Sequence, residues 1–200
     1  MPTAKLISIT PDYMTLLKAA CSKPYGKDVS DKTVQRIIAS GHLSVLEHCY
    51  ASFDVECSVR VLGQLTRHRH LSFTVKSARG SVFNQFVNPL DEVTDKPEDF
   101  MDGVYHEMIG EGYPEEVAAY YLPQGVLTSM VVTGNFRAWY EYLPKRLCKR
   151  AMPEHRELAR LILQELKTAA PLVFAGVTTN CKACTESSCE FKHKKGADNG

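Results

Sequence analysis

The chain has 200 residues, of which 44% are apolar and 24% are charged, values typical of one globular domain long enough to bury a core. Its formal net charge of +1 excludes a protein that wraps nucleic acid through an overall basic excess, so a bound anion should be small and locally held. Because the sequence has no apolar run of membrane-spanning length and no secretory signal pattern, we expect a cytoplasmic protein with neither a membrane nor a nucleic-acid partner.

The first quarter of the chain is expected to form two strands and two helices. Apolar and polar residues alternate over residues 49–57, which predicts a strand with one buried face, and residues 4–9 suit a shorter strand. Pro11 is placed to open a helix, and Ser30 to cap a second helix that Gly41 ends.

Polar residues fill the connection between the second helix and the second strand. Such a connection between two ordered elements is where binding residues are often found. Two interpretations stay open, a binding loop and ordinary turn and capping residues. The residues concerned are His42, Ser44, Glu47 and His48.

A helix capped by Ser58 leads to the most distinctive stretch of the chain, residues 67–79. Gln64 and Arg67 are three positions apart, which puts them on one face of this helix. Guanidinium groups bind phosphate or carboxylate through paired hydrogen bonds, and serine hydroxyls donate to the same oxygens. The stretch therefore predicts an anion site, with a solvated basic face as the alternative. Its polar members are Arg67, His68, Arg69, His70, Ser72, Ser77 and Arg79.

The chain from residue 82 onward is predicted to be mainly helical. Residues 82–87 and 125–133 are expected strands, the latter ended by Gly134. Asn135 should cap the next helix, and Pro144 should kink or end it because proline removes a backbone donor. A few strands among many helices, without βαβ alternation, favour an α+β domain. Further helices are expected to begin at Pro97, Pro114 and Pro153.

The cysteine- and lysine-rich residues 177–200 form a tail that follows a single domain over residues 1–176. A C-x2-C-x4-C-x3-H spacing in the tail can hold zinc, and a frayed, solvated tail is the alternative. The four other cysteines stand among apolar residues, so we expect free core thiols and no disulfide framework. The predicted zinc ligands are Cys181, Cys184, Cys189 and His193.

The motifs together resemble those of flavin-dependent thymidylate synthases. The signature lies in the Arg67–Arg69 triplet with Ser72, Ser77 and Arg79 at their spacing, and the similarity extends over residues 37–189. The resemblance implies that family's α+β domain, with a small mixed or antiparallel sheet and surrounding helices. It also implies a homotetramer whose active sites lie at subunit interfaces. Other matching segments are residues 41–48, Gln64, residues 122–123, residues 131–139 and Arg146.

The activity that the resemblance implies is the conversion of dUMP to dTMP. FAD would be the cofactor, with methylenetetrahydrofolate and NADPH as co-substrates. Arg146 would lie against the uracil edge as the catalytic residue and favour ionisation at N3, which makes C5 nucleophilic without an enzyme thiol. FAD would be held by Ser44, Arg67, His68, Arg69, Asn135 and Arg137, and the nucleotide by Gln64, Arg67, Ser77, Ala78, Arg79 and Arg146.

Four residues depart from the family pattern. Ala119 stands where an arginine usually binds the nucleotide, and Glu141 where an asparagine or histidine often lies near the flavin. Because a lost charged hydrogen bond costs about 1.5–3 kcal/mol, methylation of another pyrimidine nucleotide stays open as an alternative. A second alternative is a non-catalytic module that binds nucleotides or nucleic acid through the basic cluster and the cysteine-rich tail. The other departures are Val75 and Gly80, and Lys145, Lys149 or Arg150 could supply the missing charge.

Overall fold

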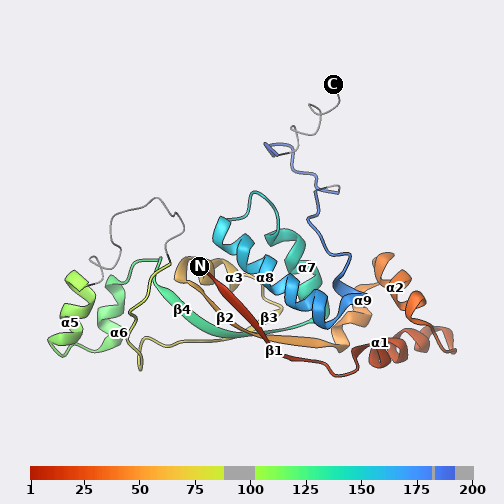
Figure 1. Ribbon diagram of the computed structural model, residues 1–200, viewed down its shortest axis with the longest axis horizontal. Helices are drawn as coiled ribbons and strands as arrows, with labels where there is room; N and C mark the ends of the chain where they lie inside the picture. The colour runs from red at the N-terminus through yellow and green to blue at the C-terminus, as the bar shows by residue number, and fades with distance from the viewer. Residues whose placement is uncertain (88–101, 182, 192–200) are drawn as a thin grey trace.

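The backbone is organised around one antiparallel sheet of four strands (Figure 1). The computed structural model describes residues 1–87, 102–181 and 183–191. Helices surround the sheet, which confirms the expected α+β class. The strands are β1 (Thr3–Ile9), β2 (Tyr50–Ser58), β3 (Leu71–Val75) and β4 (Leu127–Asn135), in the spatial order β1–β2–β4–β3.

Three helices begin where the sequence predicts a capping serine or asparagine. The side-chain oxygens of Ser30 and Asn135 each accept a backbone N–H three residues on, at 3.3 and 2.8 Å. Shorter turns join the longer helices, with η marking 3-10 turns and, for η3, a π turn. The elements are α1 (Tyr13–Ser22), η1 (Lys23–Tyr25), α2 (Asp31–Ala39), η2 (Leu43–His48), α3 (Val59–Leu65), η3 (Asp102–His106), α5 (Glu107–Gly110), α6 (Glu115–Ala118), η4 (Ala119–Tyr121), α7 (Phe136–Arg146), α8 (Pro153–Ala169) and α9 (Pro171–Phe174).

The main hydrophobic core lies between the sheet and the helices α7 and α8, which cover one of its faces (Figure 1). Phe53 of β2 and Val132 of β4 are paired and fully buried. The Trp139 ring of α7 meets Phe53 edge-on, with 5.2 Å between ring centroids. The neighbouring pair, Ser52 and Thr133, lies on the opposite face of the sheet and shares a hydrogen bond of 2.8 Å. The alternation predicted for β2 is therefore confirmed.

A second, smaller hydrophobic cluster lies near α5 and α6, at the opposite end of the molecule from α1 and α2 (Figure 1). Its buried members are Phe83, Tyr105, Ala118 and Val126, and Ala78 packs against them. The Phe83 backbone N–H donates to the Tyr105 hydroxyl oxygen at 3.1 Å. This cluster fixes the position of the segment that follows β3.

The strand β3 is the largest difference from the sequence-based prediction. Residues 71–75 pair with β4, although the sequence suggested only a run of polar binding residues there. The strand predicted over residues 82–87 is wrong, because within that segment only Phe86 forms a bridge, an isolated one to Val126. The sheet thus takes its fourth strand from inside the basic stretch.

Two predicted interruptions, at Gly134 and Pro144, do not end their elements. β4 continues through Gly134 to Asn135, so the expected break is wrong. An added Cβ there would lie 2.4 Å from the Leu71 Cδ2 atom, so a larger residue would require the Leu71 side chain to move. Pro144 lies inside α7, which continues to Arg146. A proline at this position removes the hydrogen bond that the N–H of residue 144 would donate to the Tyr140 carbonyl.

The remaining predicted helices are confirmed where the structure describes them. The helix expected from Pro97 would start among residues 88–101, outside the described residues, and the chain continues from Asp102 as η3 and α5. The helices expected from Pro114 and Pro153 correspond to α6 with η4 and to α8. Within the described ranges, no helix is long and apolar enough to cross a membrane.

A buried carboxylate joins the start of α8 to the junction of β2 and α3. Glu154 is 8% exposed and accepts both the Ser58 backbone N–H, at 2.7 Å, and the Ser58 hydroxyl, at 2.6 Å. The Ser58 hydroxyl oxygen accepts the Val61 N–H at 3.1 Å and so caps α3. Because hydrogen bonds to a charged acceptor are stronger than neutral ones, this contact holds α8 against α3.

Replacing Glu154 should therefore destabilise the fold. Glu154→Ala leaves the buried Ser58 N–H without its acceptor, and we expect it to lower the free energy of unfolding by about 2–3 kcal/mol in urea denaturation. Glu157→Ala, in an exposed ion pair on the same helix, is the matched control and should change it by less than about 0.5 kcal/mol. Equal losses in the two variants would contradict the role of Glu154.

Candidate functional site

Three predicted site residues come together where α3 and the end of α7 meet. Arg146 donates from Nε to His68 Nε2 at 2.9 Å, and from Nη1 to Gln64 Oε1 at 3.4 Å. Its Nη2 donates to the Gln64 backbone carbonyl at 3.4 Å. All three residues are half-buried. The Arg146 guanidinium is thus held in one orientation by groups from two segments of the chain.

His68 is held in its neutral form. Burial, helped by the nearby positive charges of Arg146 and Lys145, lowers the pKa of His68 to about 4. Since Arg146 Nε can only donate, His68 Nε2 accepts and the ring proton lies on Nδ1. The Tyr142 ring meets the imidazole edge-on, with centroids 4.8 Å apart. His68 therefore accepts a hydrogen bond from the guanidinium without adding a second charge beside it.

His155 and Tyr142, which the sequence analysis did not name, complete this network. His155 of α8 is fully buried, with Nδ1 at 3.4 Å from Gln64 Oε1 and Nε2 at 3.1 Å from the Tyr142 hydroxyl. The available signal was its position, because His155 precedes Leu158 and Ile162 on the buried face of α8 at helical spacing. A histidine on an apolar stripe needs buried partners.

The buried thiols of the core are unsuited to act as nucleophiles. Burial raises the pKa of Cys57 to about 12 and that of Cys49 to about 11. Because the thiolate is the nucleophilic form, these groups are inert near neutral pH. All seven cysteines lie within the described residues, and none of them forms a disulfide there.

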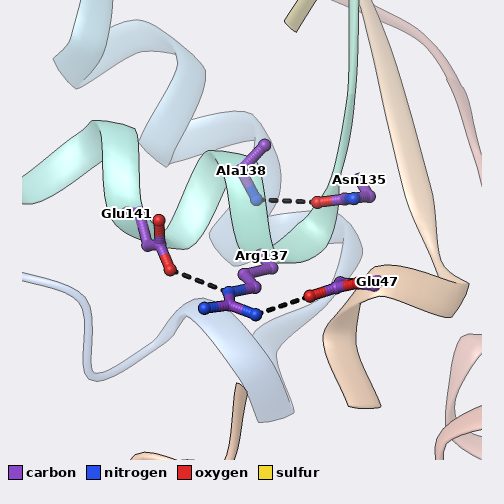
Figure 2. A network of polar contacts seen from close by, with 5 residues as sticks. All are labelled: Glu47, Asn135, Arg137, Ala138 and Glu141. Carbon is purple, nitrogen blue, oxygen red and sulfur yellow. Dashed lines mark hydrogen bonds and ion pairs between the residues drawn. The ribbon is translucent and has the colours of Figure 1, made fainter. Parts of the chain in front are cut away.

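A second group of polar residues surrounds Arg137 at the start of α7 (Figure 2). Arg137 donates from Nη1 to Glu47 at 2.5 Å and from Nε to Glu141 at 2.8 Å. The Asn135 side-chain oxygen is occupied by its capping bond to the Ala138 N–H. Two carboxylates thus surround one guanidinium, so this region carries no excess of positive charge. A surface hollow here is lined by Glu47, His70, Asn135, Arg137, Ala138 and Glu141.

The other residues predicted to bind flavin are exposed. The side chains of Arg67 and Arg69 form no hydrogen bond or ion pair with any residue that the structure describes. Because α3 ends at Leu65, Arg67 lies beyond the helix, and the prediction that it shares a helical face with Gln64 is wrong. Ser44 is exposed on η2. Two exposed guanidinium groups without partners among the described residues therefore lie just before β3.

The predicted phosphate-binding residues lie apart from the Arg146 network. The strand β3, roughly 15 Å long, separates them from the Arg67–Arg69 triplet. Arg79 forms an ion pair with Glu116 of α6 at 2.8 Å, and its backbone N–H donates to Ser77 Oγ at 3.2 Å. Ala119, one turn after Glu116, stands at the start of η4. Among the described residues, no hydrogen bond or ion pair joins this segment to Arg146.

Val75 and Gly80, two of the residues that depart from the family pattern, lie in different surroundings. Val75 ends β3 opposite Met130 and packs against the main core, which suits an apolar residue. Gly80 is exposed, and an added Cβ there would meet no atom within 4 Å. Nothing in the structure explains the glycine at position 80.

The basic residues after α7 contact the C-terminal segment. Arg150 pairs with Glu186 at 3.3 Å, and the Lys149 ammonium lies 5.6 Å from the centre of the Phe191 ring. Lys145, whose charge acts on His68, is the member of this run that affects the Arg146 network.

The zinc site of the tail stays a prediction. Cys181 is exposed, Cys184 is half-buried and Cys189 is buried. Within residues 1–87, 102–181 and 183–191, no three His, Cys, Asp or Glu side chains are grouped as metal ligands. The fourth predicted ligand, His193, lies outside these ranges.

Comparison with known proteins agrees with this architecture. A crystal structure of thymidylate synthase X (ThyX) from Helicobacter pylori with FAD and dUMP superposes with a TM-score of 0.75. The superposition covers 87% of this chain and 97% of that one, at 20% sequence identity. The fold is therefore the ThyX fold.

Sequence similarity identifies the family. Residues 5–172 match the family model described as thymidylate synthase complementing protein. The flavin-dependent thymidylate synthase of Sulfurisphaera tokodaii is 34% identical, with 88% of this chain and 78% of that protein aligned. A probable flavin-dependent thymidylate synthase of Mycobacterium phage D29 is also 34% identical, over 73% and 72%. The chain belongs to the flavin-dependent thymidylate synthase family, a family of methyltransferases.

The buried His155 should make stability depend on pH. Burial, helped by the nearby charge of Arg146, lowers its pKa from 6.5 to about 3. Between these values the unfolded chain binds a proton that the folded chain does not. The free energy of unfolding should therefore fall as the pH falls below 6.5, with a contribution from His155 of up to about 1.4 kcal/mol per pH unit.

His155→Asn cannot take up that proton, so its unfolding free energy should depend less steeply on pH. Urea denaturation of both proteins between pH 6.5 and 5 measures the two slopes. Identical slopes would show that His155 is not held neutral by the fold.

Proposed function

We propose that this protein catalyses the reductive methylation of dUMP to dTMP, with FAD as cofactor and methylenetetrahydrofolate and NADPH as co-substrates. The observation that carries the proposal is the contact of Arg146 with Gln64 and His68, residues that the family resemblance assigns to the site. The names of the relatives, and the FAD and dUMP bound to the similar ThyX structure, support the same chemistry.

Arg146 is suited to stabilise a negatively charged base. A guanidinium has five N–H donors, of which three are used by His68 and Gln64, so two remain for a ligand. Donors fixed in advance beside a developing anion lower the barrier without reorganising. In this role Arg146 favours loss of the N3 proton of uracil, which makes C5 nucleophilic. The protonated state of the buried thiols fits a mechanism without covalent attack.

The residues before β3 fit the anionic part of FAD. Arg67 and Arg69 are exposed guanidinium groups without partners among the described residues, and such groups bind a diphosphate well. Arg137 fits less readily, since it already contacts Glu47 and Glu141. When bound and reduced, the flavin supplies the hydride that completes the new methyl group.

We further propose that the active site is shared between copies in a homotetramer located in the cytoplasm. The support is the separation of the two ends of the nucleotide site within one chain, since Arg79 contacts Glu116 and not the Arg146 network. In a shared site, Ser77 and Arg79 of one copy bind the phosphate of a nucleotide whose base lies against Arg146 of another.

Tritium release from C5-labelled dUMP tests the reaction. Methylation replaces the C5 hydrogen, so the purified protein with FAD, methylenetetrahydrofolate and NADPH should release tritium. Arg146→Ala should slow release by about 10²- to 10³-fold and leave the visible flavin absorbance unchanged. Arg160→Ala, an exposed arginine of α8, should match the wild type.

Two results would contradict parts of this account. Bound flavin without tritium release would remove dUMP as substrate and direct the same assay to UMP and dCMP. Loss of FAD from Arg146→Ala would show that Arg146 binds the cofactor and not the base.

The two carboxylates around Arg137 should weaken the binding of an anionic cofactor. Glu141→Gln removes one of them, and we expect FAD to bind about two- to fivefold more tightly at low ionic strength, with a smaller gain in high salt. Titration of the apoprotein with FAD measures this, with Glu157→Gln as the control. Weaker binding in Glu141→Gln would instead indicate a direct contact between Glu141 and FAD.

A further inference from the structure

The buried imidazole of His155 has a defined direction of hydrogen bonding. Its Nδ1 faces Gln64 Oε1, an atom that can only accept, so Nδ1 carries the ring proton. Its Nε2 is then unprotonated and accepts the Tyr142 hydroxyl at 3.1 Å. The ring is fully buried, which favours this neutral form. Because Arg146 Nη1 can only donate to Gln64 Oε1, this tautomer is the one that satisfies both ring nitrogens.

The consequence is a fixed orientation of the Gln64 side chain. Its Oε1 accepts from two donors, His155 Nδ1 and Arg146 Nη1, both at 3.4 Å. An inverted amide would set its NH2 group against two donors, which is unfavourable. Among the described residues, the NH2 end donates to one weak acceptor, Met152 Sδ, at 3.7 Å. Gln64 thus has its acceptor engaged inside the network and its donors available.

The polar groups that this arrangement offers to a base are all donors. The free N–H groups of Arg146 and the NH2 of Gln64 suit carbonyl oxygens and a deprotonated ring nitrogen, which uracil provides. Cytosine instead presents an exocyclic amino group, which would meet donors and lose its hydrogen bond. A pocket that leaves a buried polar group unpaired rejects that ligand strongly.

We propose that His155 is a positioning residue that sets the preference of the site for uracil over cytosine nucleotides by holding the Gln64 carboxamide in one orientation. The proposal rests on the proposed function, because it assumes that the base lies against Gln64 and Arg146. It assigns to α8 a part in base recognition without direct contact with the nucleotide.

Binding of dUMP and dCMP to the FAD-loaded protein tests this inference. Without the His155 donor, Gln64 can rotate and offer Oε1 to an amino group. In isothermal titration calorimetry, His155→Leu should lower the ratio of the dCMP to the dUMP dissociation constant by about three- to tenfold. His155→Asn, whose side-chain N–H lies near the position of Nδ1, should restore most of the ratio. A loss of packing alone would weaken both nucleotides alike and leave the ratio unchanged.

Each outcome is decisive. An unchanged ratio in His155→Leu, or equal ratios in His155→Leu and His155→Asn, would overturn the inference while wild-type binding of dUMP keeps the proposed function. Failure of the wild type to prefer dUMP would overturn both. Should His155→Leu not fold, His155→Met replaces it in the same comparison, because methionine adapts to irregular core space.

Discussion

The arrangement of the site depends on one shared hydrogen-bond acceptor, the side-chain oxygen of Gln64. It binds Arg146 at the end of α7 and His155 at the start of α8, so three helices meet at one atom. The adjacent residue Glu154 binds Ser58, which caps the other end of α3. The first turn of α8 therefore contacts both ends of α3. Because buried polar groups are costly when unpaired, each of these contacts constrains the others.

Charge is distributed unevenly around this centre. Arg137 and Arg79, at two ends of the predicted site, are neutralised by carboxylates of the same chain. Arg67 and Arg69 have no such partners among the described residues, and Arg146 forms its hydrogen bonds with neutral groups. Guanidinium groups without a carboxylate partner thus lie where an anionic cofactor and an ionised base are proposed to bind.

The sequence predicted the elements with strong periodicity and clear caps, such as β2, α7 and α8, because burial on one face dictates both pattern and structure. It missed β3, since five residues inside a basic stretch give a weak alternation that only pairing with β4 resolves. It also placed Gln64, His68 and Arg146 in one site through family resemblance. The roles of His155 and Glu141 depend on partners chosen by the fold: 91 residues separate His155 from Gln64, and the pairing of Arg137 with Glu47 as well as Glu141 follows from the position of η2. Such long-range contacts have no local signature in the chain.

A crystal structure of the protein with FAD and dUMP tests the central claim most directly. The account predicts the uracil ring against Arg146 and the Gln64 amide nitrogen, with Gln64 Oε1 still bound to His155. It also predicts that the dUMP phosphate lies at Ser77 and Arg79 of a second copy of the chain. Uracil bound in the hollow beside Arg137, or the dUMP phosphate held by Arg67 and Arg69 of the chain that binds the base, would contradict it.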